Sequence, residues 1–274
     1  MSLNYCELNP CHYYTVPGLY FNASLKMTKI KLELLCDPEQ FLFVENSIRG
    51  GVLVIRHIHA TANNEFLPNY NPDDPASWIL FDDNNLYGHA MSHPLTTGNF
   101  KFLSPKEIKE FDIAKTAATE EVGFILEVDL KYPVHLHESQ NDYPLATEKI
   151  KITQDILSSY SQSLINNLND KIKYVLHSEN LWLYLELGMK LVKIHKILQF
   201  SQSAWIKPYI YFKTTKRKEA TSSFLQNLFK LFINSVFSEC LQNRINLKPA
   251  TNPTGERNLS RDLLFNDYIS LPKI

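Results

Sequence analysis

The stretch GFILEVDLKY, residues 123–132, decides the fold class. Apolar and polar side chains alternate from Phe124 to Leu130, the period of a strand with one buried face. Weaker strand patterns are expected over residues 31–35, 41–44, 51–59, 77–81, 171–176 and 190–200. The pattern over 190–200 also fits a helix. These strands, with helices after residue 214, predict an α+β fold.

The longest helix is predicted over about residues 216–243, where apolar side chains recur with a period of 3.6 residues. Thr214 or Thr215 can cap its start. Shorter helices are expected over residues 84–91, 153–166 and 178–187. Ser178 is the expected N-cap of the last one, and Gly188 suits the position just beyond its end.

The composition is that of an ordinary globular chain. Its 274 residues are 44% hydrophobic and 21% charged, enough for one large or two modest domains. The net charge of −1 gives no global positive field, so a polyanion would have to use a local basic run such as KTTKRK, residues 213–218. No apolar run approaches the ~18–20 residues of a membrane span, and the first residues do not resemble a signal peptide. We therefore expect no membrane partner and an intracellular protein; a nuclear location is compatible with the sequence but not determined by it.

Cysteine and histidine spacing gives weak metal signals. Cys6, Cys11, Cys36 and Cys240 form no C-x-x-C pair, so free thiols in a reducing compartment are expected rather than a zinc site. Two H-x-H pairs place two imidazoles on one face of an extended segment but specify no third ligand; they are His57 with His59 and His135 with His137. Asp129 lies in the predicted strand 123–132, where a structural role is favoured over catalysis.

Residues 80–91, LFDDNNLYGHAM, carry the first candidate motif. Asp82 ends an apolar run, where a strand can aim its carboxylate, and Tyr87 follows five positions later. Nucleotidyl transfer with two metals needs carboxylates aimed at one point, and the carbonyl of Asp83 is a further candidate oxygen ligand. The alternative is that residues 82–85 form a turn that caps the following helix.

Residues 230–238, KLFINSVFS, carry the second motif. Lys230, Asn234 and Phe237 occupy positions i, i+4 and i+7, one stripe of a helix. A lysine there can meet a phosphate, an amide a sugar or base, and a ring a base pair. Arg217 and Lys218 would add charge near the N-terminal end of the same helix, where the dipole also favours phosphate. The alternative is an exposed lysine, a polar helix position and a core ring.

Together these motifs resemble the protein-primed branch of family B DNA polymerases, and their residues are most similar to the Maverick/Polinton transposon kind. Further segments carry the resemblance, in order from about residue 10 to residue 243. They include ENSIRGG (45–51), GFILEVDLKYP (123–133), NDYPLA (141–146), YVLHSENLWLYLELGMKLVKIHKILQFSQSAWIKPYI (174–210) and TTKRKEA (214–220).

The resemblance implies a DNA-directed DNA polymerase that works with two Mg²⁺ ions, primer-template DNA, dNTPs and a terminal protein primer. Asp82 would be the catalytic residue and metal ligand, with Asp83 as a second metal contact. The implied dNTP-binding residues are Tyr87, Lys218, Lys230, Asn234 and Phe237, with Lys216 as a further phosphate contact. The implied template-binding residues are Arg49, Gly50 and Gly51, although no Tyr stands before these glycines as it does in the family.

The sequence also departs from the family. Its third motif, Y-x-D-T-D-S, does not follow residue 243, no N-terminal exonuclease is found, and Ser238 stands where the family has Gly. We therefore expect a fragment that is inactive alone: a remnant over 1–48, an incomplete palm with an antiparallel sheet over 49–200, fingers helices over 201–248, a divergent tail over 249–274, and no thumb. The alternatives are a non-catalytic nucleic-acid-binding relic of a transposon polymerase, or an unstable fragment with exposed apolar strands.

Overall fold

The computed structural model describes residues 8–49, 62–73, 85–113, 121–151 and 162–240. Helices and strands alternate irregularly along these residues. In chain order the elements are η1 (Pro10–His12), α2 (Val16–Thr28), α3 (Pro38–Ser47), α4 (Leu86–Met91), β1 (Leu95–Phe102), α5 (Pro105–Glu110), β2 (Val122–Lys131), η2 (Val134–Leu136), β3 (Glu148–Lys151), β4 (Gln162–Ile165), β5 (Lys171–His177), α7 (Ser178–Glu186), β6 (Lys190–Ser203), α8 (Lys207–Glu219) and α9 (Ser223–Cys240).

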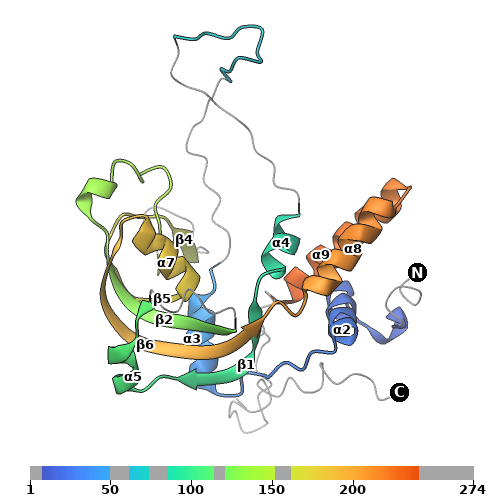
Figure 1. Ribbon diagram of the computed structural model, residues 1–274, viewed down its shortest axis with the longest axis horizontal. Helices are drawn as coiled ribbons and strands as arrows, with labels where there is room; N and C mark the ends of the chain where they lie inside the picture. Colours follow the sequence, from blue (N-terminus) through green and yellow to red (C-terminus); the bar gives the residue numbers. More distant parts are fainter. Residues whose placement is uncertain (1–7, 50–61, 74–84, 114–120, 152–161, 241–274) are drawn as a thin grey trace.

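A four-stranded antiparallel sheet forms the centre of the structure. Its strand order is β1-β6-β2-β5, and β3 pairs with β4 in a separate two-stranded sheet. The register places Leu126 of β2 opposite Leu176 of β5 and Ile197 of β6, and all three side chains are buried. Figure 1 shows that the sheet is curled and that its strands β1 and β6 extend toward the helices. The predicted α+β class with an antiparallel sheet is therefore confirmed.

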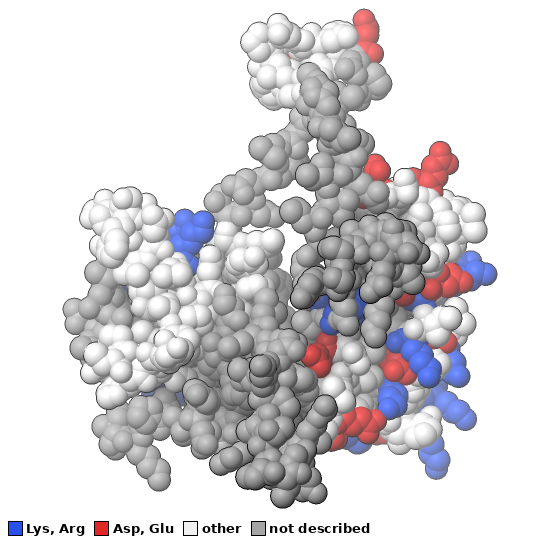
Figure 2. Space-filling model, turned by 180° about the vertical axis from the view of Figure 1, so that it is seen from behind, with Lys and Arg blue, Asp and Glu red and all other residues white. Residues whose placement is uncertain are grey.

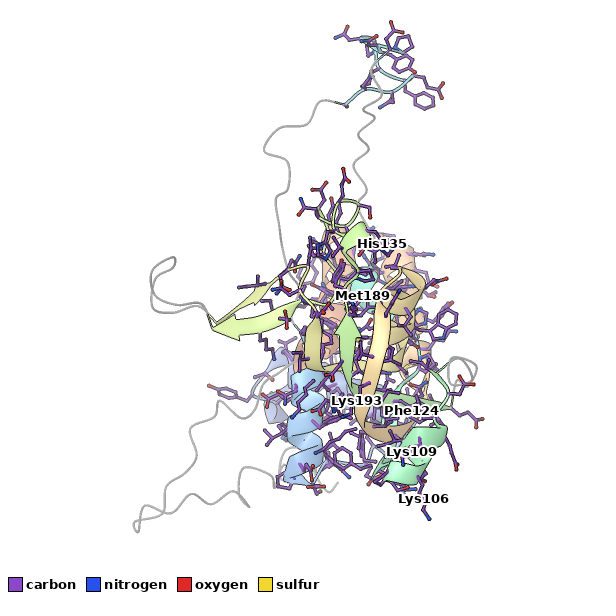
Figure 3. The ribbon with its side chains drawn as sticks, turned by 90° about the vertical axis from the view of Figure 1, so that its left-hand side faces the viewer. Lys106, Lys109, Phe124, His135, Met189 and Lys193 are labelled. Atoms are coloured by element: carbon purple, nitrogen blue, oxygen red, sulfur yellow. The ribbon has the colours of Figure 1, made fainter. Side chains whose placement is uncertain are left out.

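Alternate residues of β2 point to opposite faces of the sheet, and both faces are covered by packed side chains. Ile125 packs with Phe43 of α3 and with Phe200 of β6 on one face. Phe124 and Leu126 pack on the other face, together with Leu181 of α7. Figure 3 looks toward the second face, with Lys106 and Lys109 of α5 at one end and His135 at the other.

A second core is made mainly by helices. Helix α9 packs against α2, α8 and α4, and Figure 1 shows this group to one side of the sheet. Its buried side chains include Tyr20 of α2, Tyr209 and Ile210 of α8, Phe232 of α9 and Met91 of α4. The rings of Tyr20 and Phe232 stack with centroids 3.8 Å apart. Helix α4 precedes β1 and α8 follows β6, so the chain enters and leaves the sheet through this helical core.

Most strong periodic patterns gave the right element. The strand predicted over 123–132 is β2, that over 171–176 is β5, and that over 190–200 is β6 rather than a helix. The helix predicted over 84–91 corresponds to α4. Gly188 follows α7 with a positive φ of 99°, as expected for the residue beyond a helix end.

Several predictions were wrong. Residues 41–44 belong to helix α3, and residues 31–35 form no strand in the structure. Residues 162–165 are strand β4 rather than the end of a helix. The N-cap of α7 is His177, whose Nδ1 accepts from the backbone N–H of Glu179 at 3.2 Å, and not Ser178. Helix α2 and strand β1 lie in stretches for which no element was predicted.

The predicted long helix over 216–243 is two helices. Helix α8 ends at Glu219 and α9 begins at Ser223. Thr214 and Thr215 lie inside α8 and cap nothing, whereas the Ser222 hydroxyl accepts from the Leu225 backbone N–H at 3.3 Å. The strands expected over 51–59 and 77–81 and the tail over 249–274 lie outside the described residues. Within the described ranges, no helix has the length and apolar character that a membrane span needs.

Candidate functional site

The two sequence motifs meet where α4 packs against α9. Tyr87 of α4 and Phe237 of α9 stack with ring centroids 4.2 Å apart and ring planes 18° apart. The Tyr87 side chain is exposed and the Phe237 side chain is half-buried. The ring pair therefore presents aromatic surface to solvent beside the helical core, where a flat apolar group can stack.

Helix α4 begins directly after a residue with an unusual backbone conformation. Asn85, the residue before the helix, has a left-handed backbone with φ 68° and makes no side-chain cap hydrogen bond. Its side chain lies over Gly88, where a Cβ atom would come within 2.4 Å of the Asn85 amide nitrogen. A side chain at position 88 would therefore displace the Asn85 amide from this place. Asp82 and Asp83, just ahead of Asn85, lie outside the described residues.

Helix α9 presents its motif at the border between its buried face and solvent. Phe232 and Val236 are buried in the helical core, and the Lys230 side chain is exposed. Asn234 and Phe237 are half-buried between them. Of the alternatives, the exposed lysine is observed, and Phe237 packs half-buried against the helical core while its ring also stacks on Tyr87.

The basic run lies at the opposite end of a helix from the one predicted. Lys216, Arg217 and Lys218 occupy the last turn of α8, where the helix dipole stabilises cations by itself. These side chains therefore do not lie at a helix N-terminus, and the predicted joint attraction of phosphate by the dipole and the basic run is wrong. Lys218 is exposed, and Lys216 pairs with Glu219 of its own helix at 2.7 Å.

Lys213, the first residue of the same run, is not part of a surface patch. Its side chain is buried, and its ammonium nitrogen lies 5.1 Å from the ring centroid of Phe232 and 5.2 Å from that of Tyr209. Cation–π attraction of this kind offsets part of the cost of burying the charge. Figure 2 shows Lys and Arg intermingled with Asp and Glu over the sheet side, with no broad basic surface on that face.

Arg49, the first of the implied template residues, makes hydrogen bonds within the fold. Its Nη1 donates to the carbonyl oxygen of Val175 at 2.6 Å, and its Nε donates to that of Thr147 at 3.0 Å. Its guanidinium carbon lies 3.9 Å from the ring centroid of Tyr174. Arg49 lines a pocket of about 380 Å³, together with Asn180. Gly50 and Gly51 lie outside the described residues.

The weaker metal candidates do not assemble. His137 lies against Tyr132, with its Nε2 3.4 Å from that residue's carbonyl oxygen, and no described contact joins it to His135. The pair His57 and His59 lies outside the described residues. Cys11 and Cys36 are free and exposed. No group of three or more His, Cys, Asp or Glu side chains gathers within the described ranges.

Asp129 has the structural role favoured from the sequence. One of its carboxylate oxygens accepts from the Lys173 backbone N–H at 2.8 Å, and the other lies 2.8 Å from Nε2 of His195. The hydrogen bond from Lys173, followed by the one from His195, holds the pKa of Asp129 below its usual value. Both contacts tie neighbouring strands of the sheet together.

No protein-family model matches this chain, and no curated protein matches it significantly in sequence. Among solved structures, the chain is similar to Phi29 DNA polymerase. Against the ternary complex with primer-template DNA and incoming nucleotide, identity is 15% and the TM-score is 0.47, over 83% of this chain and 36% of that one. Against the post-translocation binary complex with primer-template DNA, identity is 18% and the TM-score is 0.48, over 83% and 35%. The chain thus spans little more than a third of the length of these neighbours.

Proposed function

We propose that this chain serves template-directed DNA synthesis, as part of a protein-primed family B DNA polymerase. The reaction is transfer of a nucleotide from a dNTP to a primer 3′-hydroxyl, with pyrophosphate as the leaving group. The observation that carries the proposal is the stacking of Tyr87 on Phe237 at 4.2 Å. It brings together the two segments, residues 80–91 and 230–238, that the sequence resemblance assigns to the metal and to the nucleotide.

The described side chains suit a nucleotide. The exposed Lys230 offers an ammonium group to a triphosphate, and Asn234 on the next turn offers an amide to the sugar or base. The Tyr87–Phe237 ring pair offers a stacking surface beside them, with Tyr87 placed under the sugar. In this proposal Lys218 and Lys216 add phosphate contacts, and their place at the end of α8 makes these contacts purely side-chain ones.

Asp82 and Asp83 would hold Mg²⁺ just ahead of α4, and the ions would stabilise negative charge on the reacting phosphate.

The same proposal assigns the segments of this chain to the parts of a polymerase. Residues 49–200 correspond to an incomplete palm and residues 201–248 to fingers, with 1–48 and 249–274 outside them. Arg49 holds the chain that leads into Gly50 and Gly51, so its part in template binding is to position this loop rather than to touch DNA. A terminal protein hydroxyl would prime synthesis.

Equilibrium binding of a fluorescent dNTP analogue in the presence of Mg²⁺ and primer-template DNA tests this function. We expect Lys230→Ala and Asp82→Asn each to weaken nucleotide binding about 10- to 100-fold, the range for losing a hydrogen bond to a charged group. Lys109→Ala, on α5 at the far end of the sheet, is the matched control and should bind like the parent chain. Unchanged nucleotide binding in both site variants would overturn the proposal.

Two further measurements separate the alternatives. Salt-sensitive DNA binding with no binding of the Mg²⁺–nucleotide would favour a non-catalytic relic that keeps only backbone contacts. Primer extension that Asp82→Asn abolishes would show that the chain is active by itself, against the expectation of a fragment that is inactive alone.

A further inference from the structure

Two exposed histidines converge beside the end of α4. His89 lies in the helix and His93 follows it, four positions later. Their Nε2 atoms are 3.3 Å apart, while their ring centroids are 4.9 Å apart with planes at 80°. The nitrogens are closer than the ring centres and the planes are nearly perpendicular, so the rings do not stack and their Nε2 atoms face each other.

This separation is the one that a shared metal ion requires. Zinc binds imidazole nitrogen at about 2.0–2.1 Å in a tetrahedral arrangement, which places two nitrogen ligands about 3.3 Å from each other. His93 lies two residues beyond α4, but its backbone N–H still donates to the Ala90 carbonyl oxygen at 3.3 Å, so the pair nearly keeps the i, i+4 spacing of two zinc ligands on a helix. Both side chains are exposed, so an ion can reach them without any rearrangement of the core.

We propose that His89 and His93 form a binding site for a divalent transition-metal ion such as Zn²⁺. No third His, Cys, Asp or Glu completes the group among the residues that the structure describes, so water would fill the other positions and the ion would exchange readily. Imidazole nitrogen favours Zn²⁺ and Cu²⁺, whereas Mg²⁺ prefers oxygen ligands. The site is therefore distinct in chemistry from the carboxylate site proposed around Asp82, and it does not depend on that proposal.

A bound ion would fasten the last turn of α4 to the residues that lead into β1. The Ser92 hydroxyl already donates to the Gly88 carbonyl oxygen at 2.7 Å, so the backbone between the two histidines is ordered before metal arrives. Preorganised ligands lose little conformational entropy on binding. Without metal, the same 3.3 Å contact is a hydrogen bond between one ring N–H and the other ring nitrogen.

Zinc titration of the untagged chain by calorimetry, without DNA or nucleotide and with millimolar Mg²⁺ present, tests the site. The parent chain should bind one equivalent of Zn²⁺ that His89→Asn and His93→Asn each weaken by at least about tenfold, because even outer-shell changes cost 10- to 100-fold in metal affinity. His135→Asn is the matched control, since this exposed histidine belongs to the H-x-H pair that does not converge.

Electron paramagnetic resonance with Cu²⁺ gives an independent view of the ligands. The parent chain should show coupling to two imidazole nitrogens, and each single variant should show one fewer. Gln variants at both positions, with unchanged circular dichroism, exclude a folding defect as the cause. Equal Zn²⁺ affinity in the parent chain and the His89→Asn/His93→Asn double variant would overturn the proposal, as would a loss of binding in His135→Asn alone.

Discussion

The ring of Tyr87 stacks on that of Phe237 at a centroid distance of 4.2 Å, although the two residues lie in segments far apart in the sequence. This ring pair connects α4 with α9. Helix α4 is short and exposes most of its side chains, and besides this ring pair the buried Met91 packs with α9 in the helical core. The stacking energy should therefore appear as a measurable coupling between the two positions.

A double-mutant cycle on Tyr87→Ala and Phe237→Ala tests this coupling. We expect an interaction free energy of about 0.5–1.5 kcal/mol, the range for aromatic pairs, from denaturant unfolding of the four chains. Tyr87→Phe should keep the coupling because it keeps the ring. Tyr211→Ala in place of Tyr87→Ala is the control, since this tyrosine is exposed on α8 and should add independently to Phe237→Ala. Simple additivity of the Tyr87 and Phe237 changes would refute the stacked contact.

His177 should make the stability of the chain depend on pH. Its neutral ring caps α7 by accepting from the Glu179 N–H, and burial lowers the pKa of His177 below its usual value of 6.5. The unfolded chain therefore binds a proton at a higher pH than the folded chain does. Stability should be full above pH 6.5 and should fall as the pH drops from there to the folded pKa.

The measurement is urea unfolding of the parent chain and of His177→Asn between pH 7.5 and pH 5. Asn is a good N-cap that does not titrate in this range, so the variant should lose the part of the pH dependence that His177 supplies. His135→Asn, at an exposed site, should keep the parent profile. If the parent and His177→Asn lines stay parallel over the whole range, the titration of His177 does not contribute.

How far the sequence predicts this fold depends on the length of each pattern. The alternation in β2 was long enough to predict a strand outright, whereas the pattern over residues 190–200, which form β6, also fitted a helix. The apolar run at residues 41–44 is too short to separate strand from helix by period alone. The deciding signal was just before it, where the Asp37 side chain caps the N–H of Glu39 and Pro38 opens α3.

The break between α8 and α9 shows a different limit. Residues 220–222 are Ala, Thr and Ser, with neither Gly nor Pro to mark an end, so an unbroken apolar stripe suggested one helix. In the structure α8 and α9 pack against each other, which only a break permits. The same error placed Lys218 at the wrong end of a helix, because the boundary decides which helix terminus lies near this residue.

Some features of the candidate site could be predicted from local spacing, and others could not. The stripe of Lys230, Asn234 and Phe237 follows from helical spacing, and one exposed and two half-buried side chains are observed there. The contact of Phe237 with Tyr87 is long-range, so spacing could not predict it; only the resemblance put both rings beside one nucleotide. Nothing in the run KTTKRK indicated that Lys213 is buried among aromatic rings.

Lys171 and Glu148 form a buried pair that stability measurements can test. The Lys171 side chain is fully buried and its ammonium nitrogen lies 2.8 Å from the Glu148 carboxylate, which also accepts from the Asn167 side chain at 2.7 Å. Burial lowers the pKa of Lys171, while Glu148 acts against that shift. Glu148→Gln leaves the cation without its charged partner and should cost about 3 kcal/mol of unfolding free energy.

Lys171→Met should cost less than Glu148→Gln, because it replaces the buried charge with an apolar side chain of similar length, and Glu148 keeps Asn167 and some solvent. Chemical denaturation of both variants gives the comparison. Lys149→Ala, at the exposed neighbouring position, should stay within about 0.5 kcal/mol of the parent. The reverse order, with Lys171→Met the more damaging, would mean that the pair is not the main role of Lys171.

Arg49→Lys separates the two roles that the sequence and the structure give to this residue. Arg49 donates to the carbonyl oxygens of Thr147 and Val175 and lies flat over Tyr174, which a compact ammonium group cannot reproduce. We expect the substitution to lower the unfolding free energy by about 2 kcal/mol, the scale of a lost charged hydrogen bond, despite the retained charge. Arg217→Lys at the end of α8 should change it little.

DNA binding by the same variants completes the test. If Arg49 acts by positioning the loop at Gly50 and Gly51, Arg49→Lys should weaken primer-template binding without lowering its salt slope, because no phosphate contact is lost. A salt slope reduced by about one, at unchanged unfolding free energy, would instead mean that Arg49 leaves its carbonyl partners and contacts a phosphate directly. Tyr174→Phe, which keeps the ring under the guanidinium but loses the hydroxyl bond to the Thr147 carbonyl, should bind DNA with the parent slope.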